Sequence, residues 1–600
     1  MAIKSPSDIV DLTLTLVVLV NGEAIADYYP SVSVEISHEI NKISTAELVF
    51  EDGLVEDGTF PISDGNIFVP GNEIEILAGY GGEAKSSIFS GVIVKQSLDV
   101  DGDDAFRLNV RCKHKAIGMT FNRNNAEFVS MTDSDIINKL LNANGISGTV
   151  SATTVTQETV LQKGSTDWDF MLSRAEFYGL LVKCVKGDAL EIKKPAFSEE
   201  PVLRLAFGDS IISFNAELDA QWQPSTLEAV SWDIKNLAVA TENAAEPSLN
   251  NQGDFSAKKL SGTIVTSKRT LFSGAPMEPA EMKEWADAAL LKTRLAALRG
   301  SVSFQGNGLI EPAKLVQLEG VGTRYSGKAF VSAVTHQIDD GGNWKTTAKF
   351  GLDSTPIAEM SHFNEPPAAG QLPAINGLQV ATVKNLFEDP QSLYRIQLTL
   401  NSGLGSQTGI WARVSNFYAT ANAGSGFLPE VGDEVVVGFL DSNPRYPVVL
   451  GSLYSSSKAP ANAAADNNNY IKSILTKGNL KISFDDEKKV TKLETPAGNT
   501  FTLDDENKKI EMKDQHGNTI TMNDSGIKLS SDKDISINAG GNISLKADGK
   551  VTISAKSDAS MEGMNVSHKA QSSFTAKGSA MAEISSSGQT TVKGSMVMIN

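Results

Sequence analysis

The chain has 600 residues, of which 41% are hydrophobic and 21% are charged, so it can build the cores of several domains. Its formal net charge is −19 at pH 7, and the sequence contains no run of basic residues. Such an acidic surface repels phosphate groups, which argues against nucleic-acid binding. Cys112 and Cys184 lie far apart in the sequence, and we expect both to be buried free thiols, as in a protein made in a reducing compartment.

The N-terminus resembles a signal peptide only superficially. An apolar run, Leu12–Val20, precedes the small residues Ala24 and Ala26, but Asp8 and Asp11 interrupt the approach to it. The run alternates like a strand, so we expect the first strand of a domain and no export signal. No stretch reaches the roughly 20 apolar residues that a transmembrane helix needs.

Residues 1–370 are predicted to be mostly β with a few helices. The predicted strands are Leu12–Val20, Ser31–Ile36, Ala46–Phe50, Glu73–Ala78, Ile88–Leu98, Phe106–Cys112, Ser301–Phe304, Leu315–Leu318, Phe330–Gln337 and Thr346–Phe350. Three helices are expected at Ser134–Asn144, Asp167–Tyr178 and Pro279–Arg299. The first two follow polar capping residues, and the third begins with a proline and is predicted to end at Gly300.

Two linkers divide the rest of the chain. A stretch rich in Pro, Ala and Gly spans Asn364–Gly377, and a small polar stretch spans Ser455–Asn469. Five strands are predicted in the short segment between them, at Val380–Leu386, Tyr394–Leu400, Trp411–Val414, Glu434–Phe439 and Pro447–Leu450. Short strands without a helix favour a small barrel of the OB type. We therefore expect three regions, 1–370, 371–458 and 459–600.

The third region is repetitive. GNTFTLDD at Gly498 recurs as GNTITMND at Gly517, and eight-residue repeats then begin at Ile527, Ile535 and Ile543. A fourth repeat begins at Val551, and from the second repeat on apolar residues occupy positions one, three and five, followed by a polar corner. Short strands with a turn at every repeat are typical of a β-solenoid.

A single chain cannot stabilise such octads. Burying about three apolar side chains contributes at most about 5–8 kcal/mol, whereas ordering eight backbone units costs about 8–16 kcal/mol. Neighbouring copies must therefore share the core and complete the hydrogen bonds. Three chains wound into a prism would close every edge, so the sequence predicts a homotrimer with a triple-stranded β-helix needle.

The β segment between the linkers resembles the OB-fold core of valine–glycine repeat spike proteins (VgrG) of type VI secretion and extracellular contractile injection systems. The matching residues are Trp411, Arg413, Val414, Phe427, Pro429, Glu430, Gly432, Asp433, Glu434, Val435, Gly438, Phe439, Pro444, Pro447, Gly451 and Ser452. STDWDFMLSRAEFYGLLVKC from Ser165 resembles the phage-hub-like region of that family, although less sharply. The resemblance implies two β-barrels in the first region, followed by the OB barrel and the needle.

No catalytic or cofactor-binding constellation is found. The six histidines have no metal-ligand spacing, and His516 and His568 are expected on corners or faces of the needle. The aspartates of DVDGDD, residues 99–104, lack the glycine and glutamate of a calcium loop, so a solvated hairpin turn is expected. The glycines of NSGLGSQTG, from Asn401, lie within the predicted barrel and are read as a loop.

The resemblance implies a mechanical function. The trimer would plug a tail tube, bind tube and baseplate proteins, carry effector cargo, and puncture a target envelope when the apparatus fires. It would be made in the cytoplasm and leave the cell as part of a phage tail-like particle. The apolar end formed by Met596, Val597, Met598, Ile599 and Asn600 is expected to bind a conical PAAR-type tip protein. The alternatives are a spike with hydrolase activity and a trimeric fibre or adhesin.

Overall fold

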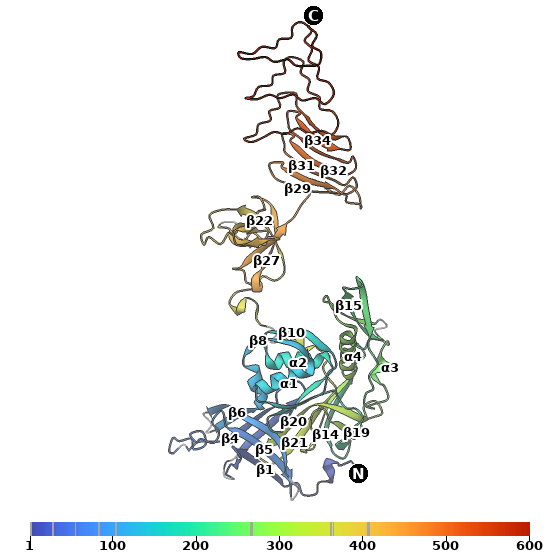
Figure 1. The fold of residues 1–600 in the computed structure, drawn as a ribbon. Coiled ribbons are helices and arrows are strands. Elements are labelled where there is room, and N and C mark those ends of the chain that lie inside the picture. Colours follow the sequence, from blue (N-terminus) through green and yellow to red (C-terminus); the bar gives the residue numbers. More distant parts are fainter. Residues whose placement is uncertain are drawn as a thin grey trace. The chain divides into compact units, whose positions relative to one another are not determined.

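A computed structural model gives the fold of the chain (Figure 1). It describes all residues except 1–2, 27–28, 30, 55, 82–84, 102–104, 265–267, 361–362, 364, 405–407 and 600. The chain divides into two compact units, Met1–Leu453 and Tyr454–Asn600. Among the described residues, none of the helices is both long and apolar enough to cross a membrane.

A 13-stranded sheet dominates the first unit (Figure 1). Its first half contains β1 (Leu14–Val20), β2 (Glu23–Ala24), β3 (Ser31–Glu39), β4 (Thr45–Glu51), β5 (Glu73–Tyr80), β6 (Ser86–Asp101) and β7 (Ala105–Lys113). Its second half contains β13 (Leu203–Ala206), β14 (Ile211–Leu218), β18 (Leu298–Gln305), β19 (Leu315–Glu319), β20 (Gly327–Asp339) and β21 (Trp344–Phe350). All ten strands predicted in this region are confirmed in position, with ends that differ by a few residues.

The two halves of the sheet meet where β3 pairs antiparallel with β20, with Ile36 opposite His336. Each half has its own apolar core. The first core includes Phe50, Phe68 and Phe89, and the second includes Phe304 and Phe350. Alternating strand residues supply most of both cores, because successive side chains of a strand point to opposite faces.

Two helices begin where their capping residues predict. α1 (Asp133–Ala143) begins after Thr132, whose hydroxyl accepts the Asp135 N–H. α2 (Asp167–Phe177) begins after Thr166, which caps the Asp169 N–H in the same way. Both arrangements satisfy a backbone donor that has no partner within the helix.

The predicted end of the third helix is wrong. α4 (Pro279–Leu295) stops at Leu295, and Arg299 and Gly300 belong to β18. A Cβ at Gly300 would lie 2.2 Å from the carbonyl oxygen of Asn215 on the neighbouring strand β14. The glycine is therefore required by close strand pairing rather than by a helix C-cap.

Smaller elements surround these helices. The remaining strands of this part are β8 (Arg123–Thr132), β9 (Ser147–Val150), β10 (Thr156–Thr166), β11 (Leu181–Val185), β12 (Ala189–Lys193), β15 (Leu227–Asp233), β16 (Ala238–Asn243) and β17 (Arg269–Phe272). The short helices of the first unit are η1 (Pro6–Asp8), η2 (Lys115–Thr120), α3 (Ala257–Leu260), η3 (Ile357–Glu359), η4 (Pro367–Gly370) and η5 (Leu440–Ser442). Strands β15–β17 form a sheet whose inner face packs on α4 through Leu227, Met282 and Leu290.

The predicted OB-type barrel is confirmed. Five strands close into a barrel in the order β22-β23-β24-β28-β27. They are β22 (Gln379–Asn385), β23 (Ile396–Leu400), β24 (Ile410–Val414), β27 (Glu434–Phe439) and β28 (Pro447–Ser452), with a small hairpin of β25 (Ala419–Thr420) and β26 (Ala423–Gly424) outside the barrel. Buried aliphatic residues such as Leu398, Val435 and Val449 fill its interior.

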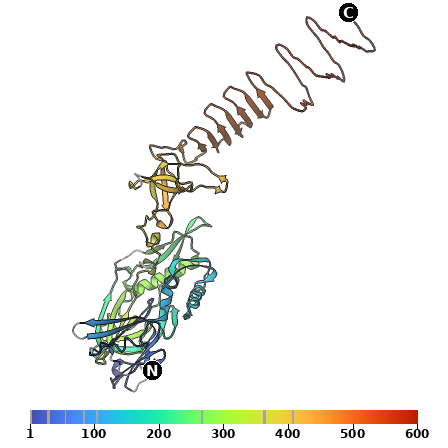
Figure 2. The same ribbon diagram turned by 90° about the vertical axis from the view of Figure 1, so that its left-hand side faces the viewer.

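The second unit begins as a seven-stranded antiparallel sheet (Figure 2). Its strands, five residues each, are β29 (Ile471–Leu475), β30 (Lys481–Asp485), β31 (Val490–Glu494), β32 (Thr500–Asp504), β33 (Lys509–Lys513), β34 (Thr519–Asn523) and β35 (Gly526–Ser530). Each strand pairs only with the strands before and after it. Beyond β35 the chain continues as open zigzag turns through residue 599.

Candidate trimerisation surface and other sites

The sheet of the second unit is built from a repeated hairpin. The turns that begin at Thr495 and Asp514 are equivalent: each first residue accepts a backbone N–H from a glycine three positions on, Gly498 or Gly517. The φ angles of these glycines are 91° and 92°, a conformation that favours glycine. In both turns the side chain of the first residue also accepts the N–H four residues on. The sequence repeat noted at Gly498 and Gly517 is therefore a repeat of turn geometry.

One face of this sheet is apolar and uncovered in the single chain. Cross-strand pairs place apolar side chains opposite one another in two columns. The first column is Ile474, Ile482, Leu493, Phe501, Met512, Ile520 and Leu529; the second is Phe484, Thr491, Leu503, Ile510, Met522 and Ile527. Most of these side chains are 37% or more exposed. The opposite face carries polar residues such as Lys492, Thr502 and Glu511. A soluble chain rarely leaves such a surface uncovered, which marks it as an interface.

The predicted strands of the octads are formed only in part. The first, from Ile527, lies in β35, but the described residues 531–599 contain no strand in the single chain. Their apolar side chains, including Ile537, Leu545 and Ile553, are exposed. Within the described part of the second unit, no other segment pairs with these octads. This is the behaviour expected if their hydrogen-bond partners belong to other copies of the chain.

The residues predicted to bind a tip protein lie at the end of this segment. Met596, Val597, Met598 and Ile599 are exposed, Ile599 to 90%, and Asn600 lies outside the described residues. The four described side chains form a short apolar terminus. They supply apolar contact area but no charged group.

The OB-fold signature residues occupy strands and one turn of the barrel. Trp411 and Arg413 lie in β24, Glu434, Gly438 and Phe439 in β27, and Gly451 in β28. Gly432 has φ 86° and donates its N–H to the carbonyl of Val383, and the Asp433 carboxylate accepts the N–H of Glu430. The turn before β27 is thus fixed by these two residues, which gives the signature a structural role.

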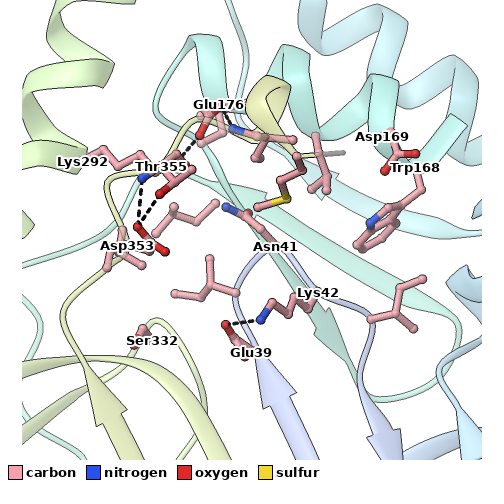
Figure 3. A pocket seen from close by; sticks show the side chains of 18 of the residues that line it. Glu39, Asn41, Lys42, Trp168, Asp169, Glu176, Lys292, Ser332, Asp353 and Thr355 are labelled. Atoms are coloured by element: carbon pink, nitrogen blue, oxygen red, sulfur yellow. Dashed lines mark hydrogen bonds and ion pairs between the residues drawn. The ribbon is translucent and has the colours of Figure 1, made fainter. Parts of the chain in front are cut away.

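A cavity of about 700 Å³ lies in the first unit (Figure 3). Its wall is mainly apolar, with Trp168 and Leu172 from α2 and Leu291 from α4. Two ion pairs lie at its margin: Lys42 binds Glu39 at 2.8 Å, and Lys292 binds Glu176. Its volume lies in the range of small-molecule sites. The lining residues that the structure describes include neither His nor Cys, so this described part of the wall holds no nucleophile–histidine pair.

The fold also gathers three histidines that the sequence analysis treats as scattered. His38, His114 and His336 line a cavity of about 60 Å³ together with Cys184. The rings of His38 and His336 lie 6.4 Å apart. These residues are far apart in the sequence, so no spacing rule could bring them together. Among the described residues, no cluster of three His, Cys, Asp or Glu side chains is arranged to hold a metal ion.

Hydrogen bonds fix the protonation of these histidines. In His38 and His114 the Nε2 atom faces carbonyl oxygens, of Ile88 at 2.8 Å and of Gly187 at 3.0 Å, so Nε2 carries the proton. In His336 the Nδ1 atom accepts the indole N–H of Trp344 at 3.3 Å. Burial lowers the pKa of all three rings, that of His336 to about 3. The cluster is therefore neutral at pH 7 and serves as a polar part of the core.

The other sequence motifs have structural positions. Asp99 and Asp101 lie at the end of the long strand β6, which pairs with β7, while Asp103 and Asp104 lie outside the described residues. In the stretch from Asn401, Gly403 has φ 86° in a turn, whereas Gly405 lies outside the described residues. His362 also lies outside the described residues. Both cysteines are free thiols, as predicted. Cys112 is buried, as expected, and burial raises its pKa to about 12, whereas Cys184 is half-buried.

Comparisons with protein families define the class. Residues 379–454 match the "Type VI secretion system/phage-baseplate injector OB domain", and residues 490–563 match the "Phage baseplate V C-terminal trimerisation domain". The closed barrel and most of the apolar face fall in these two segments. The chain is thus of the contractile-tail spike class, and the resemblance to VgrG proteins is confirmed. A third model, described as "Alg8 N-terminal domain", matches residues 10–340, more than half of the chain, so the chain belongs to this family.

Curated relatives include the "Type VI secretion system spike protein VgrG1c" of Pseudomonas aeruginosa, 26% identical over 26% of this chain and 22% of that protein. Another is the "Actin cross-linking toxin VgrG1" of Vibrio cholerae, 28% identical over 20% of this chain and 11% of that protein. The chain thus matches less than a quarter of the length of these two relatives. The trimerisation-domain match supports a homotrimer.

Solved structures that align with the chain include a tail protein from Neisseria meningitidis, 13% identical, covering 58% of this chain and 98% of that one with a TM-score of 0.42. The Francisella PdpA-VgrG complex is 8% identical and covers 86% of this chain and 80% of that one with a TM-score of 0.39. Both TM-scores are below 0.5.

Proposed function

We propose that the chain is the structural hub and spike of a contractile injection apparatus, and that it acts as a homotrimer. The observation that carries this proposal is the uncovered apolar face of β29–β35, which continues into octads with no partner strand in the described part of the single chain. Three such sheets packed with their apolar faces inward form a closed prism, and the octads that follow gain backbone hydrogen-bond partners from the neighbouring chains. A closed prism resists bending, which is the property that a puncturing device needs.

Each of the three regions has its own role. Residues 1–370 bind tail-tube and baseplate proteins. The separate apolar cores of the two halves of the 13-stranded sheet support the two barrels that the VgrG resemblance implies. Residues 371–458 form the OB barrel and connect to residues 459–600, which form the needle. The particle leaves the producing cell with the spike, which contacts the target envelope only when it fires.

The apolar terminus supports a tip protein as the partner at the end of the needle. Three copies of Met596–Ile599 would meet on the threefold axis and present an apolar surface that needs a cover. A PAAR-type tip protein fits this role, and effector cargo would be carried by either protein.

Pull-down of the tip protein tests this assignment. A chain truncated before Ser595 should lose tip binding, whereas Lys593→Ala, a change just before the apolar terminus, should retain it. Retention of the tip by the truncated trimer would reject the assignment.

We also propose that the chain itself has no enzymatic activity. The toxin-named relative is matched over 11% of its length, and the described residues that line the cavity of about 700 Å³ include neither His nor Cys. Incubation with peptidoglycan tests the hydrolase alternative, and a glycan-binding assay tests the fibre alternative. Solubilised peptidoglycan fragments or a bound glycan would favour the respective alternative.

A further inference from the structure

The cavity of about 700 Å³ in the first unit is lined by apolar side chains from four parts of the chain (Figure 3). Trp168 and Leu172 come from α2, Leu291 comes from α4, Ile43 lies in the turn between β3 and β4, and Leu352 follows β21. The aromatic and thioether side chains at its margin, which are 86% and 39% exposed, mark where the cavity opens to solvent: Phe121 and Met360. A small molecule can therefore reach an apolar interior.

The carboxylates among the described lining residues already accept hydrogen bonds from protein groups. Two of them bind lysines and two bind hydroxyl groups: Glu39 with Lys42, Glu176 with Lys292, Asp169 with Thr166, and Asp353 with Thr355. A peptide in this cavity would give up hydrogen bonds to water at its N–H and C=O groups and would find few free partners. A hydrocarbon chain has no such groups, so the wall favours a hydrocarbon chain.

Lys113 brings to the same cavity a positive charge that lacks a counter-charge. It is the last residue of β7, and its side chain points away from the core that buries Cys112, because successive side chains of a strand alternate. The residue is half-buried, and among the residues that the structure describes no group pairs with its ammonium. Lys115, two positions on, binds Glu73 at 2.6 Å and Asp188 at 2.7 Å. A partly desolvated ammonium without a partner favours an anionic ligand.

We propose that this cavity binds a fatty acid in its carboxylate form. The carboxylate accepts a hydrogen bond from the ammonium of Lys113, and the hydrocarbon chain packs among Trp168, Leu172 and Leu291. The cavity volume suits a ligand of this size. All of these residues lie in the first unit of one chain, so the site depends neither on the needle nor on the trimer.

Isothermal titration calorimetry with the purified full-length protein tests the class of ligand. The ligands are decanoate, dodecanoate and dodecyltrimethylammonium, each below its micelle concentration. The wild type should bind one dodecanoate per chain. Each buried methylene tightens binding about fourfold, so dodecanoate should bind about 15-fold more tightly than decanoate. The cationic amphiphile of the same chain length should bind at least about tenfold more weakly than dodecanoate, because its head group is repelled by Lys113.

Two substitutions of one charge test the residue that holds the carboxylate. Lys113→Glu should weaken dodecanoate binding at least about tenfold. Lys95→Glu is the matched control, because it makes the same change at an exposed lysine of the neighbouring strand β6 that does not line the cavity, and it should bind dodecanoate like the wild type. Should Lys113→Glu fail to fold, Lys113→Gln replaces it, because the amide removes the charge and keeps a polar side chain. Leu291→Trp, which fills part of the cavity, should also weaken binding.

The outcomes separate this inference from the proposed function. A wild type that binds no dodecanoate, a Lys113→Glu variant that binds it as tightly as the wild type, or equal binding of the cationic amphiphile overturns the fatty-acid site and leaves the spike intact. Flotation with phosphatidylglycerol vesicles that is lost in Lys113→Glu would assign the cavity to a phospholipid and overturn the proposal in the same way. A monomeric wild type that still binds dodecanoate would overturn the trimer and leave the site.

Discussion

Replacing Leu503 by Asp tests whether the apolar face of β29–β35 joins the three chains. Leu503 lies in the second column, between Thr491 and Ile510, and is 40% exposed in the single chain. Full burial of a leucine side chain contributes roughly 1.5–3 kcal/mol, so covering the exposed part contributes roughly 0.6–1.2 kcal/mol per chain and roughly 2–4 kcal/mol per trimer. Since about 1.4 kcal/mol is a factor of ten, this single contact changes the trimer dissociation constant roughly 30- to 700-fold.

The aspartate adds a second penalty, because three carboxylates would be buried together without partners. We therefore expect Leu503→Asp to sediment as a monomer at micromolar concentration in analytical ultracentrifugation, where the wild type sediments as a trimer. Thr502→Asp is the matched control, since it places the same charge on the same strand but on the polar face, opposite Lys492 and Glu511. A Leu503→Asp chain that sediments as a trimer like the wild type would refute the assignment of this face.

Two further predictions concern the first unit. The imidazole of His336 takes up a proton below the ordinary pKa of 6.5 in the unfolded chain, but only near pH 3 in the folded chain. The free energy of unfolding should therefore fall as the pH falls from 6.5 towards 3. The urea midpoint of His336→Gln should change less between pH 7 and pH 4.5 than that of the wild type. An equal change in both proteins would contradict this reasoning. Arg294 is fully buried and binds Glu246 through two nitrogens at 2.7 and 3.1 Å, so Arg294→Ala should lower the free energy of unfolding by about 3 kcal/mol. Arg204→Ala, which breaks the exposed pair with Glu319, should leave the free energy of unfolding nearly unchanged, and similar losses in both variants would show that burial does not decide the effect.

The parts of the fold that depend on local signals were predictable from the sequence. The caps Thr132 and Thr166 fix the starts of two helices, and the alternation in residues 378–454 indicates the barrel strands. Gly300 shows where local reasoning fails. A glycine after a helical pattern is typical of a C-cap, but here the approach of Asn215 on another strand decides its role, and that strand is distant in the sequence.

The same limit applies to the candidate sites. The octads predict an interface because, within eight residues, the free energy gained by burying the apolar side chains is smaller than the cost of ordering the backbone. The histidine cluster depends on contacts between β3, the start of η2 and β20, which no periodicity reveals.

The lengths of the two repeats, the hairpin of β29–β35 and the octad that follows it, also constrain how the needle can evolve. Duplication or loss of one whole hairpin returns the chain to the same column, as Ile482, Phe501 and Ile520 illustrate, and one octad does the same further along. A change of any other length would turn the downstream side chains out of phase unless a compensating slip follows. Natural variants should therefore differ in reach by whole steps, so that the depth of penetration is set in discrete increments.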